Sequence, residues 1–320
     1  MKSNQEKFHV INTLDLSGCP EAVAALLEVA SIETLPADRS TVLNAICRAD
    51  AYLASLSLRV DEEFIRRAKK LKVIGSPATG TDHLDLNAIA KAKITCFDIS
   101  KERKLLDGFT ATSELAFGLV LALSRRLIEA TNSARNADWA RERFSGFQLY
   151  GKTLGVLGMG RLGEISTKIG VGFGMRVIAY DPVRRDIDNV EWTDFDSLFR
   201  ESDVVTVHVH LTEQTQKLVN ERVLRLMKPT ALLINTSRGG VIDEVALLKA
   251  LRAGWIKGAG LDVINGEWSS AIVDHPLIRY ANEANNLLIT PHIGGATRES
   301  IVGARIFMAL KVANYLRASY

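Results

Sequence analysis

The stretch Thr153-Leu-Gly-Val-Leu-Gly158-Met-Gly160-Arg-Leu-Gly163 decides the fold of this chain. Its first five residues are largely apolar and predict a buried strand, and residues 161–171 repeat apolar side chains at helical spacing. A glycine triplet alone is a weak signal. Placed between a strand and a helix, it predicts a turn that accommodates the pyrophosphate of a dinucleotide.

Each residue of this turn has its own physical task. Gly158 makes the tight turn, Gly160 lets a pyrophosphate approach the backbone, and Gly163 lets the helix and the strand pack closely. Arg161 and Leu162 begin the helix, where free N–H groups and the positive end of the helix dipole attract phosphate. We therefore expect these five residues to bind the cofactor.

A carboxylate follows the second strand of this unit. Residues 176–180 predict a strand that ends at Asp181, about 20 residues after the glycines, as the dinucleotide pattern requires. Such a carboxylate accepts hydrogen bonds from both ribose hydroxyls of NAD and repels the 2′-phosphate of NADP. The alternative is a turn aspartate before Pro182, and Arg184 and Arg185 weigh against strict exclusion of NADP. The pattern favours NAD.

Three later segments each place a polar side chain after an apolar strand. Arg238 follows residues 231–235, Glu267 follows residues 258–263, and His292 follows residues 287–290. In doubly wound folds, ligands bind at the carboxyl ends of the strands. A methyltransferase can also use a glycine-rich turn, but that function would not explain the presence of Arg238, Glu267 and His292 after these strands.

Together these three residues suit the interconversion of a 2-keto acid and a 2-hydroxy acid. Arginine holds and polarises carboxylate and carbonyl groups. Histidine delivers a proton to the forming alkoxide, and an acid orients the imidazole. Each has a simpler alternative when taken alone: a solvated turn for Arg238, a surface acid for Glu267 and a structural histidine for His292. The combination predicts hydride transfer.

Strands alternate with helices on both sides of the glycine turn. One series runs through residues 8–97 and another through 153–290, and a helix is predicted at 298–317. Two such series predict an α/β protein with two doubly wound parallel-sheet domains. Between them, residues 113–130 predict one long helix. Residues 135–150 form either a loop on their own domain or an arm that buries aromatics on a second subunit.

The composition is that of a globular protein. The chain has 320 residues, 47% of them hydrophobic and 24% charged, with a net charge of +3 from scattered basic residues. This argues against nucleic acid as a partner. The beginning has no apolar signal segment, and residues 115–123 are too short to span a membrane. Three distant cysteines predict neither disulfides nor a metal site, and we expect a cytoplasmic enzyme.

The chain resembles the D-isomer-specific 2-hydroxyacid dehydrogenases along nearly its whole length. The most specific segments are LGVLGMGRLG, NTSRGGVIDEVALLKAL, GAGLDV and LLITPHIGGAT. The resemblance implies a Rossmann NAD-binding domain at 111–291, inserted into a flavodoxin-like substrate-binding domain at 1–110 plus 292–320. It implies that Arg238 binds substrate, that Glu267 and His292 form the acid–base pair, and that Asp262 holds the nicotinamide carboxamide.

The same resemblance assigns further residues. The family's substrate-carboxylate loop matches residues 75–83, so we expect the backbone N–H groups of Ala78, Thr79 and Gly80 to bind an anion. Asp82 and His83 fit a helix-capping role ahead of residues 84–90 better than a role in binding. We also place the two residues that follow strands in the cofactor-binding set, namely His208 and Thr236.

Several departures from the family pattern leave the substrate open. Trp268 stands where many members have proline, His210 replaces another proline, and Leu115 replaces a histidine. Formate oxidation is disfavoured because those members carry glutamine at the position of Glu267. A phosphite dehydrogenase and a non-enzymatic NAD-sensing corepressor remain as alternatives. We expect a homodimer that acts on a small 2-hydroxy or 2-keto acid.

Overall fold

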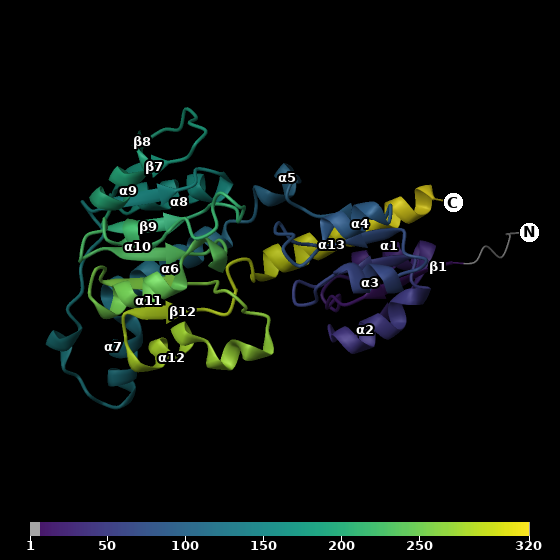
Figure 1. Ribbon diagram of the computed structural model, residues 1–320, viewed down its shortest axis with the longest axis horizontal. Helices are drawn as coiled ribbons and strands as arrows, with labels where there is room; N and C mark the ends of the chain where they lie inside the picture. Colours follow the sequence, from purple (N-terminus) through teal and green to yellow (C-terminus); the bar gives the residue numbers. More distant parts are fainter. Residues whose placement is uncertain (1–6, 320) are drawn as a thin grey trace, which may run out of the picture. The chain divides into compact units, whose positions relative to one another are not determined.

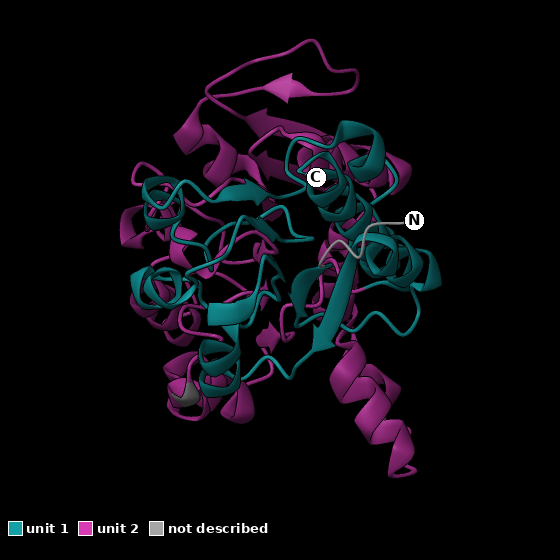
Figure 2. Ribbon diagram, turned by 90° about the vertical axis from the view of Figure 1, so that its right-hand side faces the viewer, with its two compact units in different colours: residues 1–109, 297–320 teal, residues 110–296 magenta. Residues whose placement is uncertain are grey.

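The computed structural model describes residues 7–319, apart from the side chain of Ser270. The chain divides into two compact units, drawn in different colours in Figure 2. Unit 1 comprises residues 1–109 and 297–320, and unit 2 comprises residues 110–296. The sequence predicts these boundaries at 110/111 and 291/292 instead. His292, which that prediction assigns to the substrate-binding domain, lies in unit 2.

Unit 1 contains a five-stranded parallel sheet in the order β2-β1-β3-β4-β5, which is the flavodoxin-like order. Its strands are short, and the three central ones, β1, β3 and β4, are almost entirely buried, as expected when helices cover both faces. The strands are β1 (Phe8–Asn12), β2 (Ala30–Thr34), β3 (Ala51–Leu53), β4 (Val73–Gly75) and β5 (Thr95–Phe97).

The last helix of the chain belongs to unit 1 and packs on its sheet. A Cβ atom at Gly75 would lie 2.7 Å from a methyl group of Val312, so the glycine permits the close approach of α13 (Arg298–Ala318) to β4. The helices of unit 1 are α1 (Pro20–Val29), α2 (Arg39–Ala45), α3 (Glu62–Arg67), α4 (Leu86–Lys91), α5 (Arg103–Leu106) and α13 (Arg298–Ala318), with a 3-10 turn η1 (Ile46–Arg48).

The capping role that we expected for Asp82 and His83 is wrong. Helix α4 begins after Asp85, whose side chain accepts a hydrogen bond of 2.9 Å from the N–H of Ala88. The ring of His83 lies instead 3.0 Å from the hydroxyl of Ser76, directly after β4. The cap is displaced because the chain makes a turn at 81–84 before the helix begins.

Unit 2 contains a seven-stranded parallel sheet in the order β12-β11-β10-β9-β6-β7-β8. The chain passes outward from β6 through β7 and β8, then returns to β9 on the other side of β6. This reversal between β6 and β9 is where doubly wound folds bind ligands. The strands are β6 (Thr153–Leu157), β7 (Arg176–Tyr180), β8 (Glu191–Trp192), β9 (Val204–Val207), β10 (Leu232–Asn235), β11 (Gly258–Leu261) and β12 (Leu287–Ile289).

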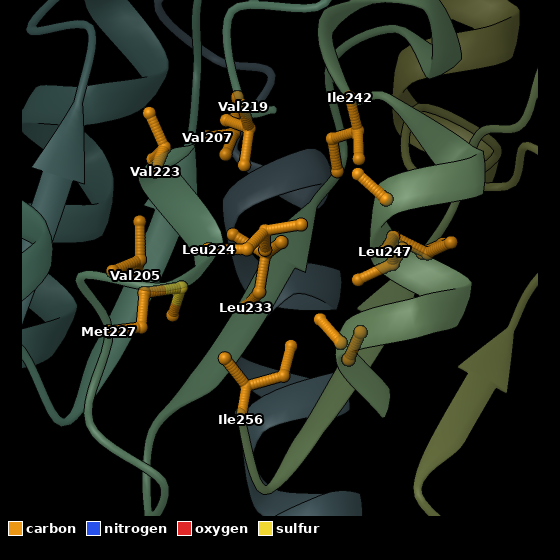
Figure 3. Packing of buried hydrophobic residues seen from close by; sticks show 14 of the residues in the cluster. Val205, Val207, Val219, Val223, Leu224, Met227, Leu233, Ile242, Leu247 and Ile256 are labelled. Atoms are coloured by element: carbon orange, nitrogen blue, oxygen red, sulfur yellow. The ribbon is translucent and has the colours of Figure 1, made fainter. Parts of the chain in front are cut away.

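Helices cover both faces of this sheet (Figure 1). On one face, Val205, Val207 and Leu233 of the strands pack against α10 and α11, as Figure 3 shows. Side chains alternate between the two faces along a strand. Val204, next to Val205, and Leu232, next to Leu233, therefore face the core on the other side of the sheet, which α6 covers. The helices are α6 (Ala111–Arg125), α7 (Leu127–Arg135), α8 (Arg161–Gly172), α9 (Phe195–Glu201), α10 (Glu221–Leu224), α11 (Glu244–Arg252) and α12 (Pro276–Glu283). Three 3-10 turns complete the unit: η2 (Arg141–Phe144), η3 (Gly239–Val241) and η4 (Ser270–Asp274).

The long helix expected at 113–130 is two helices. It breaks at Arg126, whose φ of 52° lies in the left-handed region. By length and composition, Arg103–Arg125 is apolar enough to cross a membrane, a property that core helices of soluble proteins share. Here α5 and α6 are separate helices, and Leu119 of α6 packs over Gly260 of β11. Of the most apolar 18-residue window of that stretch, 33% is buried.

Candidate active site

The glycine turn lies at the reversal of the sheet. Gly158 has a φ of 90°, and a Cβ atom there would lie 2.9 Å from the backbone carbon of His208, which follows β9. A Cβ at Gly163 would lie 2.3 Å from the carbonyl oxygen of Gly158. A Cβ at Gly160 would meet no described atom within 4 Å. The first and third glycines are required by the chain itself, whereas Gly160 faces open space.

Helix α8 begins directly after this turn. Arg161 and Leu162 are its first two residues, with Gly160 as the extended N-cap. The Ser113 hydroxyl donates to the carbonyl of Leu162 at 2.9 Å and thereby ties α6 to the start of α8. The N-terminal N–H groups of a helix attract anions, so this end of α8 suits a pyrophosphate.

Asp181 follows β7 and reaches back to the glycine turn. One carboxylate oxygen accepts a hydrogen bond of 2.8 Å from the N–H of Met159, and the other accepts one of 2.9 Å from the N–H of Val183. These bonds fix the carboxylate beside the residue that separates Gly158 from Gly160. A hydrogen bond therefore connects the predicted phosphate-binding turn to the carboxylate that is predicted to bind the ribose.

Buried polar atoms of two side chains at the same sheet edge have no partner among the described residues. They are His208, at both ring nitrogens, and Thr236, at its hydroxyl. His208 follows β9 and Thr236 follows β10, and these strands are paired through Val207 and Asn235. Burial lowers the pKa of the His208 imidazole to about 4, so the ring is neutral near pH 7. Buried polar groups normally have hydrogen-bond partners, so both side chains fit a polar ligand such as a dinucleotide.

The loop that carries Arg238 is shaped by a residue that the sequence did not single out. The buried Asn235 accepts from the N–H and hydroxyl of Ser237 at 3.0 and 2.7 Å, and its amide donates to the carbonyl of Arg238 at 2.9 Å. A Cβ at Gly239 would lie 2.4 Å from the backbone of Ile264. The Arg238 loop is thus pressed against the loop that follows β11.

Glu267 and His292 form a direct pair. Nδ1 of the imidazole lies 2.6 Å from Oε1 of Glu267, and both side chains are about one-fifth exposed. The second carboxylate oxygen accepts from the N–H of Ile264 at 3.3 Å. The Trp268 indole lies beside the imidazole, with ring centroids 5.8 Å apart. Because Nδ1 is held by the carboxylate, Nε2 is the nitrogen left for a ligand.

Asp262 supports the turn that presents His292. Its carboxylate is buried and accepts from the hydroxyl of Thr290 at 2.6 Å and from the N–H groups of Ile293 and Gly294 at 2.8 and 2.7 Å. The backbone of His292 adopts a φ of 54° within this turn. These contacts make Asp262 the anchor of the turn that carries the histidine. The nicotinamide role that the resemblance implies for Asp262 stays a prediction.

Unit 1 holds the loop expected to bind a carboxylate. The N–H groups of Ala78, Thr79 and Gly80 donate to no residue within 7–319. Thr79 is exposed, while the carbonyl of Ala78 is held by the N–H of Ile99 at 3.2 Å. Consecutive amides without partners are available to an anion.

Residues 117–294 match the family described as "D-isomer specific 2-hydroxyacid dehydrogenase, NAD binding domain". This match covers more than half of the chain and nearly all of unit 2. It includes the glycine turn, Asp181, His208, Thr236 and the Glu267–His292 pair.

Relatives match the chain over most of its length. It is 39% identical to a glyoxylate reductase of Thermococcus litoralis over 295 residues, which is 88% of this chain and 83% of that protein. It is 35% identical to D-3-phosphoglycerate dehydrogenase of Methanocaldococcus jannaschii over 93% of this chain and 56% of that longer protein. Among solved structures, D-lactate dehydrogenase from Aquifex aeolicus, complexed with NAD and lactic acid, shares 28% identity at a TM-score of 0.82, covering 97% of this chain and 96% of that one.

Proposed function

Since the chain belongs to the D-isomer-specific 2-hydroxyacid dehydrogenases, we propose that His292 and Glu267 are its acid–base pair. The reaction is hydride transfer between NAD(H) and a 2-hydroxy acid or its 2-keto acid. The observation that carries our proposal is the 2.6 Å contact between Nδ1 of His292 and Oε1 of Glu267.

The pair supplies a proton at a defined atom. Glu267 accepts from Nδ1 and so orients the ring, which leaves Nε2 of His292 to hold the proton that is transferred. When bound, NADH supplies the hydride that reduces the carbonyl carbon. In that direction the Nε2 proton moves to the carbonyl oxygen and the product is a hydroxyl group. In the oxidation direction Nε2 takes the proton back.

In our proposal, charged and polar groups bind the substrate carboxylate. Arg238 holds the carboxylate and polarises the carbonyl, because a guanidinium offers two parallel donors to such a group. The amides of Ala78, Thr79 and Gly80 offer further donors to the carboxylate. Two contacts support the role of Arg238: Asn235 fixes its backbone, and its own Nη1 donates to the Ser237 carbonyl at 2.8 Å.

The cofactor-binding residues are likewise assigned by proposal. The turn at Gly158, Gly160 and Gly163, with the helix start at Arg161 and Leu162, takes the pyrophosphate. Asp181 accepts from the ribose hydroxyls and thereby favours NAD over NADP. The remaining contacts are assigned to His208, Thr236 and Asp262. The open space at Gly160 and the unpartnered atoms of His208 and Thr236 support this set.

We propose glyoxylate, the smallest 2-keto acid, as a substrate. The support is that relatives named glyoxylate reductase share 36–39% identity with this chain. The test is a panel of glyoxylate, pyruvate, hydroxypyruvate and phenylpyruvate, each with NADH and NADPH. Glyoxylate with NADH should give the highest kcat/KM. Tight NADH binding without oxidation by any of these acids would instead support the NAD-sensing alternative.

We further propose a homodimer and a cytoplasmic location. No residue of α7 is buried, and the apolar side chains of Leu127, Ile128 and Trp139 are exposed in the segment after α6. Exposed apolar groups gathered in one segment favour a subunit interface. The three cysteines are free, as suits a reducing compartment. Sedimentation should give a dimer mass, and replacing Ile128 by Glu should give a monomer.

A further inference from the structure

A second charge pair lies beside the glycine turn. Nη1 of Arg185 lies 2.7 Å from Oε1 of Glu164, which stands in the first turn of α8, one residue after Gly163. Nη2 of the same guanidinium donates to the carbonyl of Met159. The side chains of Arg185 and Glu164 are 40% and 35% exposed, so a ligand in solution has access to both.

Met159 connects this pair to Asp181. Its N–H donates to the Asp181 carboxylate at 2.8 Å, while its carbonyl accepts from Arg185. A carboxylate and a guanidinium therefore flank one residue of the glycine turn. Because Asp181 is the proposed ribose ligand, Arg185 lies at the ribose end of the cofactor site, where a 2′-phosphate would stand.

We propose that Glu164 determines cofactor preference by withholding Arg185 from a 2′-phosphate. This rests on the proposed role of Asp181. Glu164, Arg185 and Asp181 together carry one net negative charge, which repels a phosphate. A phosphate also has to compete with the Glu164 carboxylate for the guanidinium. Without the charge of Glu164, Nη1 of Arg185 is free to donate a charge-assisted hydrogen bond to the phosphate, while Nη2 keeps its bond to the Met159 carbonyl.

Arg184 provides a matched control. It is the neighbouring arginine, but its guanidinium donates to a neutral group, the carbonyl of Thr193, at 3.4 Å. Removing the charge of Glu164 changes no ion pair of Arg184 in the described structure. Any gain in NADPH binding that follows from our proposal must therefore depend on Arg185 and be independent of Arg184.

The test measures the dissociation constants of NADPH and NADH by fluorescence titration without substrate. Glu164→Gln should tighten NADPH binding by about fivefold to tenfold, the effect of a freed charge-assisted contact, and change NADH binding by less than about twofold. The gain should disappear in Glu164→Gln/Arg185→Gln and persist in Glu164→Gln/Arg184→Gln. Unchanged NADPH affinity in Glu164→Gln, or a gain that survives the loss of Arg185, overturns the proposal.

Asp181→Asn, titrated in the same way, separates this inference from the proposed function. If Asp181 binds the ribose, this variant should weaken NADH binding and narrow the gap between the two cofactors. If it does so while Glu164→Gln has no effect, only the role of Glu164 fails. If Asp181→Asn leaves both affinities unchanged, the proposed ribose site fails as well. Melting curves identify any variant that has lost its fold.

Discussion

Nδ1 of His292 lies 2.6 Å from Oε1 of Glu267, although 25 residues separate them along the chain. The histidine occupies a left-handed backbone conformation, which costs roughly 1–2 kcal/mol for a residue with a side chain. Three hydrogen bonds to the carboxylate of Asp262 hold that turn in place. The bonds to Asp262 thus hold His292 in an unfavourable backbone conformation, in which its imidazole points toward Glu267.

Replacing His292 by Ala should lower kcat by about 10²–10⁴-fold, the usual contribution of a positioned acid–base group. NADH affinity should stay within about twofold, because the imidazole acts on the substrate in our proposal. Steady-state kinetics with glyoxylate and a fluorescence titration of NADH measure the two quantities. Turnover close to that of the unchanged protein would remove His292 from the mechanism.

Glu267→Gln should have a smaller effect on kcat, about 10–10²-fold, because the imidazole remains but loses its charged partner. Glu221→Gln is the control, since Glu221 of α10 pairs with Lys249 of α11 and with Arg225, directly after α10, apart from the described site contacts. It should leave kcat unchanged. Equal kinetics in both variants would contradict an orienting role for Glu267.

Asp262→Asn should destabilise unit 2 even without cofactor. An amide has one acceptor oxygen, so one of its N–H groups would face a backbone N–H of residue 293 or 294. A buried mismatch of this kind costs about 1–3 kcal/mol in the free energy of unfolding. Urea unfolding without cofactor measures it. Glu267→Gln, at a partly exposed carboxylate, should cost less; equal losses would contradict the anchoring role.

Alanine substitutions at two glycines of the turn should have different effects, one on NADH affinity and the other on the stability of the fold. Gly160→Ala should keep the melting temperature, because its Cβ meets no described atom and its φ of −77° suits alanine. It should nevertheless weaken NADH binding, since the methyl group occupies the space that our proposal assigns to the pyrophosphate. Gly163→Ala should lose about 1–3 kcal/mol of stability through overpacking against Gly158. Unchanged NADH affinity in Gly160→Ala would contradict the proposed phosphate site.

Local patterns in the sequence predicted the fold class and its sheets. Apolar runs such as Val204–Val207 and Leu232–Asn235 identify buried parallel strands by composition alone, and both are fully buried. The break at Arg126 was missed because neither glycine nor proline marks it. A left-handed arginine depends on packing of α6 and α7, which local periodicity does not contain.

The sequence pointed to the residues of the candidate site, but it did not reveal which of them contact one another. Arg238, Glu267 and His292 were recognisable because each follows a strand. The roles of Asn235 and Asp262 depend on the paths of their loops. Asp262 contacts residues 28–32 positions further along the chain, and such pairings follow from the tertiary structure. Asp85 likewise caps α4 because the preceding turn sets where that helix begins.

The buried ring nitrogens of His208 should make stability depend on pH in a specific window. Burial lowers its pKa from 6.5 to about 4 in the native protein. Between these values the unfolded chain binds a proton that the native chain does not, so stability falls as pH falls through this window and is regained above it. The loss should reach about 2 kcal/mol at roughly pH 5.

His208→Gln removes this titration, so its free energy of unfolding should fall less than that of the unchanged protein between about pH 7 and pH 5. The difference between the two slopes is the measured quantity, because other carboxylates titrate equally in both proteins. Urea unfolding at several pH values without cofactor provides it. Parallel slopes would show that the imidazole of His208 is accessible to protons in the native state, contrary to its shielded ring nitrogens.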